Sequence, residues 1–161
     1  LSLRRQRQMC IRDSFGDDPQ ISLGISNRGL FLEKVKALRG IYSQDTQIYF
    51  IVGYDTVVRI LDPKYYVDRG KALHELFSQA RFLVANRAEC DQRDLRELFR
   101  REENRPFAGQ IFPLKLPPSM AWISSTLVRQ KLAQEESVRG LVPPKVEEFL
   151  AKRGFYYRHG P

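Results

Sequence analysis

The stretch QIYFIVGYD, residues 47–55, decides how this sequence is expected to fold. Its centre, residues 48–52, is a continuous run of β-branched and aromatic side chains that is too short for a helix. Runs of this kind are typical of parallel strands that are buried on both faces of a sheet. Gly53 stops the run, and Asp55 follows it closely. We therefore predict a strand over residues 48–52 that stops at Gly53.

Segments with helical and extended patterns alternate on both sides of this strand. Apolar side chains at helical spacing predict helices in residues 27–40, 69–80 and 94–103, from about Thr126 onward, and in residues 141–154. Two further strands are expected in residues 81–87 and 110–117, the second weakened by Pro113. The alternation predicts an α/β fold, in which a parallel sheet carries helices on both faces.

The ends of these helices also have recognisable residues. Asn27 and Asp68 stand at the starts of two of them, where a side-chain oxygen can accept hydrogen bonds from the first backbone N–H groups. Gly40 can end the first helix, and Pro144 suits the first turn of the last one. These four residues predict helix boundaries.

Length and composition favour one globular domain. The chain has 161 residues, of which 42% are hydrophobic and 29% are charged. No run of about 18 apolar residues is present that could form a membrane span. The two cysteines, Cys10 and Cys90, lack the paired spacing of a metal site. We therefore expect no disulfide scaffold and a reducing, cytoplasmic compartment.

The formal charge of +8 is a reason to consider a nucleic-acid partner. Residues 1–14 carry +3 of this charge, show no apolar period and resemble added, non-native sequence more than part of a domain. The other basic residues alternate with acidic ones, as in residues 93–105. This pattern favours a solvated helix face over a nucleic-acid stripe. We predict a non-native leader over 1–14, one domain over 15–157 and a tail over 158–161.

Three polar segments are predicted beyond the carboxyl ends of the strands, where ligands bind in open parallel sheets. They are residues 53–55, the segment at Asn86, and ISSTLVR at residues 123–129. Gly53 would allow a ligand to approach the backbone, and Asp55 could accept hydrogen bonds from ribose hydroxyls or a base amine. Ordinary turns use the same residue types, so a plain turn remains an alternative for the first two segments.

The segment ISSTLVR allows two interpretations. A helix that starts at Ser125 or Thr126 has unpaired N–H groups and a positive dipole end, and both favour a bound phosphate. Thr126 and Arg129 are three residues apart and share a helix face, so the guanidinium group could hold a phosphate oxygen. A serine N-cap explains the same residues without any ligand, and the chemistry alone favours the cap.

Three stretches together resemble the nicotinamide and nicotinate mononucleotide adenylyltransferases of the nucleotidyltransferase superfamily. ISSTLVRQKL (123–132) is similar to their ISSTxIR motif, with Val128 in place of isoleucine. FIVGYD (50–55) is similar to their FIxGxD, and LVPPKVEEFLAKRGFYY (141–157) to their closing segment. Tyr65 and Tyr66 fall where an aromatic residue of the family helps to line the dinucleotide site. The resemblance covers roughly residues 26–157.

The resemblance implies a Rossmann-like nucleotidyltransferase fold and a step of NAD biosynthesis. In that step, with Mg²⁺ present, adenylyl transfer from ATP to nicotinamide or nicotinate mononucleotide gives a dinucleotide and releases pyrophosphate. Catalysis would depend on positioning and charge stabilisation. The resemblance assigns the ATP phosphates to Ser124, Ser125, Thr126 and Arg129. It assigns nucleotide contacts to Gly53, Asp55, Tyr65, Tyr66 and Asn86.

One part of the family pattern has no counterpart in this sequence. The family begins with a strand, a GxFxPxHxGH loop and a helix, and the histidines of that loop stabilise the transferring phosphates. His74 lies in a predicted helix and His159 in the tail, and neither belongs to an HxGH motif. We therefore expect no catalytic residue and little or no turnover from this chain. We favour an amino-terminally truncated domain over a relative that has lost catalysis.

Two other functions remain open. Pantetheine-phosphate adenylyltransferases and cytidylyltransferases of the same superfamily can share the serine-rich helix start and a VPP ending. They do not usually carry a strand followed by GYD, so they rank second. A non-catalytic basic module that binds nucleotides or nucleic acid ranks last, because it depends mainly on the arginines of residues 1–14. Both the amide and the acid form of the mononucleotide remain open as substrates.

Overall fold

The computed structural model describes residues 18–85 and 92–153. The chain divides into two compact units. One unit is Ser26–Trp122, and the other combines residues 1–25 with residues 123–161. Asn86 lies outside the described residues, as do Cys10, Cys90 and His159.

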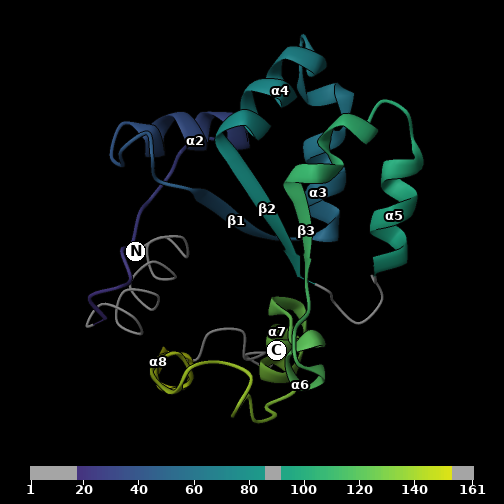
Figure 1. Ribbon diagram of the computed structural model, residues 1–161. Coiled ribbons are helices and arrows are strands. Elements are labelled where there is room, and N and C mark those ends of the chain that lie inside the picture. Colours follow the sequence, from purple (N-terminus) through teal and green to yellow (C-terminus); the bar gives the residue numbers. More distant parts are fainter. Residues whose placement is uncertain (1–17, 86–91, 154–161) are drawn as a thin grey trace. The chain divides into compact units, whose positions relative to one another are not determined.

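The unit Ser26–Trp122 is built on a three-stranded parallel sheet (Figure 1). Its strands are β1 (Ile48–Gly53), β2 (Ala80–Ala85) and β3 (Ile111–Leu114), in the order β1-β2-β3. Both pairings are parallel, and Phe82 stands opposite Phe50 on one side and Ile111 on the other. All three predicted strands are therefore confirmed, together with the Rossmann-like α/β class.

Helices precede, connect and follow the strands of this unit. They are α2 (Phe31–Arg39), α3 (Tyr54–Leu61), α4 (Arg69–Gln79), α5 (Gln92–Arg100) and the short α6 (Pro118–Ala121), with 3₁₀ turns η1 (Pro63–Tyr65) and η2 (Arg105–Gln110). Helix α3 was not predicted, since no element was assigned to the residues that follow Gly53. Its signal was nevertheless present, since Val57, Ile60 and Leu61 lie at helical spacing and all three are buried.

The predicted helix caps are partly confirmed. The Asp68 carboxylate accepts a hydrogen bond from the Lys71 N–H at 2.9 Å, and it caps α4 as expected. The prediction for Asn27 is wrong, because α2 begins only at Phe31. There the Glu33 carboxylate accepts a hydrogen bond from the Leu30 N–H at 3.4 Å, so an acidic side chain inside the helix satisfies the first amide.

One face of the sheet forms the core of the unit. Phe31 of α2 packs edge-on against Phe50 and Phe82, with ring centroids 5.0 and 5.4 Å apart. The Phe77 ring of α4 also packs edge-on against Phe82, with centroids 5.5 Å apart. Val57 of α3 is fully buried in the same cluster. The buried face therefore joins α2, α3 and α4 to the central strand, and helices on this face are confirmed.

The alternate side chains of the strands have a different environment. Tyr49 is 45% exposed, Ile51 68% and Phe112 40%, although all three are large and apolar or aromatic. The strand register places Ile51, Leu83 and Phe112 in one row across the sheet. The continuous apolar run of β1 thus suggested burial on two faces, whereas the alternate side chains of the second face are largely accessible.

The described part of the second unit contains two helices, α7 (Ser125–Ala133) and α8 (Pro144–Arg153). Both confirm predicted helices, and Pro144 is the first residue of α8 as expected. Leu132 and Val138 are buried at 2% and 4% exposure. In the described part of the chain, no helix is both long and apolar enough to cross a membrane.

Candidate functional site

The start of α3 presents a free carboxylate directly after β1. Gly53 ends the strand and is also the N-cap of the helix, and Asp55 lies in the first turn. Asp55 is exposed, and within the described residues its carboxylate accepts no hydrogen bond and forms no ion pair. The positive end of the helix dipole stabilises a negative charge at this position. The arrangement can accept hydrogen bonds from a ligand at the carboxyl end of β1.

Among the described residues of the unit, nothing explains why residue 53 is a glycine. Its backbone angles, φ −87° and ψ 165°, are open to any residue. A Cβ atom added there would meet no atom within 4 Å. Neither backbone strain nor internal crowding requires glycine, so the close approach of a ligand remains as its predicted role.

A pocket of about 270 Å³ lies beside the body of α3. It is lined by residues from the start of α2, from α3 and from the η1 region: Gly29, Leu30, Phe31, Thr56, Arg59, Ile60, Tyr65 and Tyr66. The structure thus brings both predicted tyrosines into one pocket. The lining is mainly apolar and aromatic with a few polar groups, which is the usual character of a small-molecule site.

The two tyrosines of this aromatic pocket have different roles. The Tyr66 hydroxyl donates a hydrogen bond to the Ile60 carbonyl at 2.7 Å, and burial raises the pKa of Tyr66 against the opposing effect of Arg69. Tyr65 is 43% exposed, and the Lys64 ammonium lies 4.9 Å from its ring centroid. Tyr66 is therefore anchored to the protein, whereas the Tyr65 ring is available for stacking.

Arg59 is a pocket residue that the sequence analysis missed. It lies in the last turn of α3, it is exposed, and within the described residues its guanidinium group forms no ion pair. The nearby Lys64 differs, because it pairs with Asp62 at 2.8 Å. A spacing signal existed, since Arg59 stands four residues after Asp55 and shares its helix face. Arg59 thus supplies a positive charge to the aromatic pocket.

The serine-rich motif at the start of α7 contains one residue that caps the helix and two residues with free backbone amides. Ser124 is the N-cap, and its Oγ accepts a hydrogen bond from the Leu127 N–H at 3.1 Å. The cap interpretation is therefore confirmed for Ser124. Ser125 and Thr126 are exposed, and within the described residues their backbone N–H groups donate to no acceptor. Two donors remain free at the positive end of the helix.

Arg129 joins these donors on the same face of α7. Its Nη2 donates a hydrogen bond to Thr126 Oγ1 at 3.2 Å, which confirms that the two side chains lie together. Arg129 is exposed, and its other N–H groups can reach a ligand. Two amides, two hydroxyls and one guanidinium group thus form a donor cluster suited to an anion. Gly53 and this cluster belong to different units, so a common site stays a prediction.

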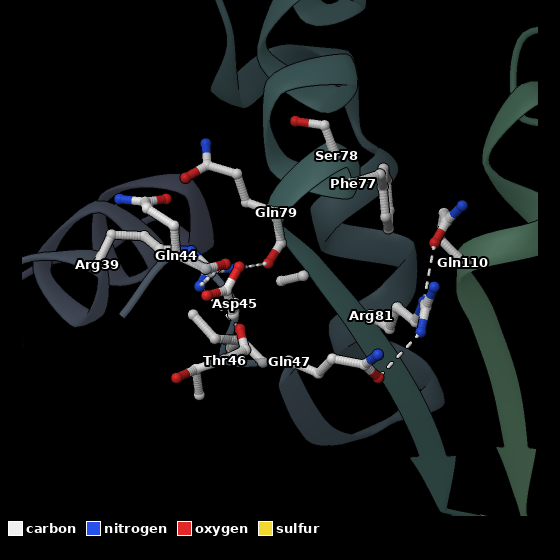
Figure 2. Close-up of a pocket in the computed structure, with 12 residues that line it drawn as sticks. Arg39, Gln44, Asp45, Thr46, Gln47, Phe77, Ser78, Gln79, Arg81 and Gln110 are labelled. Carbon is white, nitrogen blue, oxygen red and sulfur yellow. Dashed lines mark hydrogen bonds between the residues drawn. The ribbon is translucent and has the colours of Figure 1, made fainter. Parts of the chain in front are cut away.

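A second pocket, of about 280 Å³, lies at the opposite, amino ends of the strands (Figure 2). Its arginines are already engaged. Arg39 Nη1 donates to the carbonyls of Ser43, Gln44 and Thr46, at 3.1, 3.2 and 2.8 Å. Its Nη2 donates to the Gln79 carbonyl at 2.8 Å. Arg39 therefore ties the loop before β1 to the end of α4, a structural role that sequence patterns did not indicate.

The histidine and metal chemistry of the described residues is limited. His74 lies within α4 as predicted, and its ring packs against Phe107 with centroids 5.2 Å apart. Within residues 18–85 and 92–153, no group of three or more His, Cys, Asp or Glu side chains is placed to hold a metal ion.

Comparison with known proteins gives a consistent set of relatives. No protein-family model matches the chain. A relative from Thermoanaerobacter sp. strain X514 is 30% identical over 125 residues, which are 78% of this chain and 54% of the relative. One from Staphylococcus epidermidis is 27% identical over 150 residues, 92% of this chain and 66% of the relative. One from Moorella thermoacetica is 29% identical over 130 residues, which are 78% of this chain and 53% of the relative.

All three relatives carry the name "Probable nicotinate-nucleotide adenylyltransferase". The chain spans between about half and two thirds of their length.

Proposed function

We propose that this chain, which belongs to the nicotinate-nucleotide adenylyltransferase family, contains the nucleotide-binding part of an enzyme that joins ATP to a pyridine mononucleotide. A phosphate oxygen of the mononucleotide forms a bond to the α-phosphorus of ATP. The bond from that phosphorus to the oxygen bridging the α- and β-phosphates breaks, and pyrophosphate leaves. The products are a dinucleotide and pyrophosphate, and the protein contributes positioning and charge stabilisation.

The start of α7 carries this proposal most directly. The free N–H groups of Ser125 and Thr126 and the Arg129 guanidinium group form a donor cluster for the phosphates of ATP. Ser124 contributes mainly by capping the helix through its Oγ, and so orients these donors. Its hydroxyl hydrogen stays available for a phosphate oxygen, as the resemblance implied.

The aromatic pocket supports the assignment of the second substrate. Tyr65 offers an exposed ring on which a planar pyridine can stack, and Tyr66 forms a fixed wall beside it. Gly53 and Asp55 lie at the other end of α3, where the carboxylate could accept hydrogen bonds from ribose hydroxyls. Asn86 follows β2 in the sequence and is proposed to contact the nucleotide as well.

Arg59 favours the acid form of the pyridine over the amide. None of the residues that line the aromatic pocket is acidic, and Arg59 adds a cation that has no ion pair within the described residues. A nicotinate carboxylate would pair with this group, whereas a neutral amide would not. Nicotinate mononucleotide is therefore the proposed acceptor, in agreement with the names of the relatives.

Mg²⁺ is proposed to accompany ATP. The described residues offer no cluster of three metal ligands, so the phosphates of ATP would supply most of its coordination. The ion would neutralise charge on the phosphates, and the residues described here would hold the nucleotide. A cytoplasmic location also stays a prediction.

Calorimetric titration of the whole chain tests the proposal. We expect ATP and nicotinate mononucleotide each to bind, and the amide mononucleotide to bind more weakly. The Arg59→Gln variant should remove most of that preference and leave ATP binding unchanged. Preferential binding of pantetheine phosphate or CTP would favour the related transferases. Binding of a DNA duplex alone, in a chain without residues 1–14, would favour the basic binding module.

Turnover is a separate expectation. Pyrophosphate release from ATP and nicotinate mononucleotide should stay near background, because the sequence contains no HxGH motif and His74 packs against Phe107. Removing groups that stabilise transferring phosphates costs orders of magnitude in rate. Robust pyrophosphate release by the purified chain would contradict this expectation without weakening the assignment of the substrates.

A further inference from the structure

A network of hydrogen bonds lies next to the aromatic pocket and is centred on Arg69. Arg69 is the first residue of α4, and its Nε donates to the carbonyl of Leu61, the last residue of α3, at 2.8 Å. Its Nη1 donates to the Glu103 carbonyl at 3.0 Å, and its Nη2 donates to Asn104 Oδ1. One planar guanidinium group thus joins α3, α4 and the turn after α5.

The far side of this network is buried, and both polar atoms of its side-chain amide have a partner. Asn104 is only 3% exposed, and its Nδ2 donates to the Leu98 carbonyl of α5 at 2.9 Å. The Arg69 guanidinium group also lies 5.8 Å from the centroid of the Phe107 ring. A buried amide that donates and accepts in this way fixes its own orientation, and it therefore holds Arg69 in one place.

The near side of the network ends at the pocket. The last carbonyls of a helix have no partner within the helix, and a cation at that end is favourable. In α3 the Ile60 carbonyl accepts from the Tyr66 hydroxyl, and the Leu61 carbonyl accepts from Arg69. The segment 62–68, which carries both pocket tyrosines, is thus tied back to the end of α3 by its own Tyr66 and by Arg69 directly after it.

We infer that Arg69 is a positioning residue that holds the tyrosine wall of the aromatic pocket in place for the pyridine mononucleotide. Arg69 does not line the pocket, and it acts through Leu61 and the segment 62–68. This inference rests on the proposed function, since it assigns the pocket to the mononucleotide. A lysine cannot replace the arginine, because a single ammonium group cannot reach the Leu61 carbonyl and the Glu103 and Asn104 oxygens at the same time.

The test compares the whole chain with three variants. Arg69→Lys keeps the positive charge but loses the planar guanidinium group and its several donors. Arg96→Gln is a matched control, because Arg96 is exposed on α5 and within the described residues its side chain has no partner. Leu95→Ala removes a core side chain that is 9% exposed and lies outside the network, and it therefore reports the effect of lowered stability alone. For each protein we would measure melting temperature, affinities for nicotinate mononucleotide and ATP, and hydrogen exchange of residues 62–68.

The expected pattern separates positioning from stability. Arg69→Lys should bind the mononucleotide roughly tenfold more weakly and ATP with unchanged affinity, because a misplaced wall affects only its own ligand. Exchange in residues 62–68 should rise in this variant more than in Leu95→Ala, even if Leu95→Ala melts at a lower temperature. Arg96→Gln should match the original chain in every measurement.

The outcomes distinguish the inference from the proposed function. Unchanged exchange of residues 62–68 and unchanged mononucleotide affinity in Arg69→Lys would overturn the positioning role and leave the proposed function intact. Equal losses of ATP and mononucleotide affinity would reduce Arg69 to a stabilising residue. If the original chain bound ATP but no pyridine mononucleotide, the assignment of the pocket would fail, and the role of Arg69 toward that ligand would fail with it.

Discussion

The two helix starts that carry the predicted site residues, at α3 and at α7, have opposite chemistry. Helix α3 has a glycine cap without a side-chain hydrogen bond and an aspartate in its first turn. Helix α7 has a serine cap that is hydrogen-bonded, no acidic residue in its first turn, and an arginine one turn later. The first start therefore accepts hydrogen bonds and the second donates them. A helix dipole alone therefore does not define a phosphate site, because the side chains of the first turn decide which ligand group fits.

Of the substitutions at these two helix starts, Arg129→Ala should have the largest effect on ligand affinity. It removes a charge-assisted contact worth roughly 1.5–3 kcal/mol, so ATP affinity should fall by about ten- to a hundredfold. Because Arg129 is exposed, the melting temperature should change little. Arg139→Ala is the matched control, since Arg139 is also an exposed arginine of the same unit. A lowered melting temperature with unchanged ATP affinity would show that the motif is a helix cap and not a phosphate site.

Replacing Asp55 by asparagine tests the other helix start. If the carboxylate accepts hydrogen bonds from ribose hydroxyls, its loss should weaken nucleotide binding by about tenfold. The stability should fall by only about 0.3–1 kcal/mol, the usual contribution of an acidic residue to the first turn of a helix. Chemical denaturation and calorimetry on the same sample measure both quantities. Stronger nucleotide binding would mean that the ligand places a phosphate near α3. The start of α3 would then favour an anion, as the start of α7 is proposed to do.

Replacing Ser124 by alanine separates the cap from the donor cluster. The variant loses the hydrogen bond from the Leu127 N–H to Ser124 Oγ, so the free energy of unfolding should fall by about 1 kcal/mol. ATP affinity, measured well below the melting temperature, should fall less than in Arg129→Ala, because the amides of Ser125 and Thr126 and the Arg129 guanidinium group are unchanged. Ser124→Asn is the control, since asparagine also caps helices. A large loss of ATP affinity in both variants would place Ser124 in the phosphate contact itself.

Replacing Gly53 by alanine should have the smallest effect on stability. No positive φ and no neighbour within 4 Å opposes a Cβ atom, so the free energy of unfolding should change by less than about 0.5 kcal/mol. If a ligand approaches this backbone, nucleotide affinity should fall all the same. Unchanged affinity would leave Asp55 as the main contact at α3. A large loss of stability would reveal crowding that the structure does not contain.

Local features of the fold could be predicted because neighbouring residues in the chain determine them. The three strands followed from short apolar runs, and the Asp68 cap followed from a residue type that accepts backbone hydrogen bonds. The pairing of Thr126 with Arg129 depended only on the three-residue spacing within one helix. Helix α3 was not predicted, although the apolar spacing that begins at Val57 was already present in the sequence; with eight residues, the helix gives only a short periodic signal.

The sequence by itself determined the α/β class, the positions of the three strands and the donor-rich start of α7, because backbone periodicity and helix capping act over a few residues. Only the tertiary structure decided which strand face was buried, that Arg59 joins Tyr65 in one pocket, and that Arg39 and Arg69 are engaged within the protein. Arg39 donates a hydrogen bond to Gln79, which is forty residues away in the sequence, and Arg69 donates one to Asn104, which is thirty-five residues away. No local pattern encodes such pairs, because the packing of the helices on the sheet creates them.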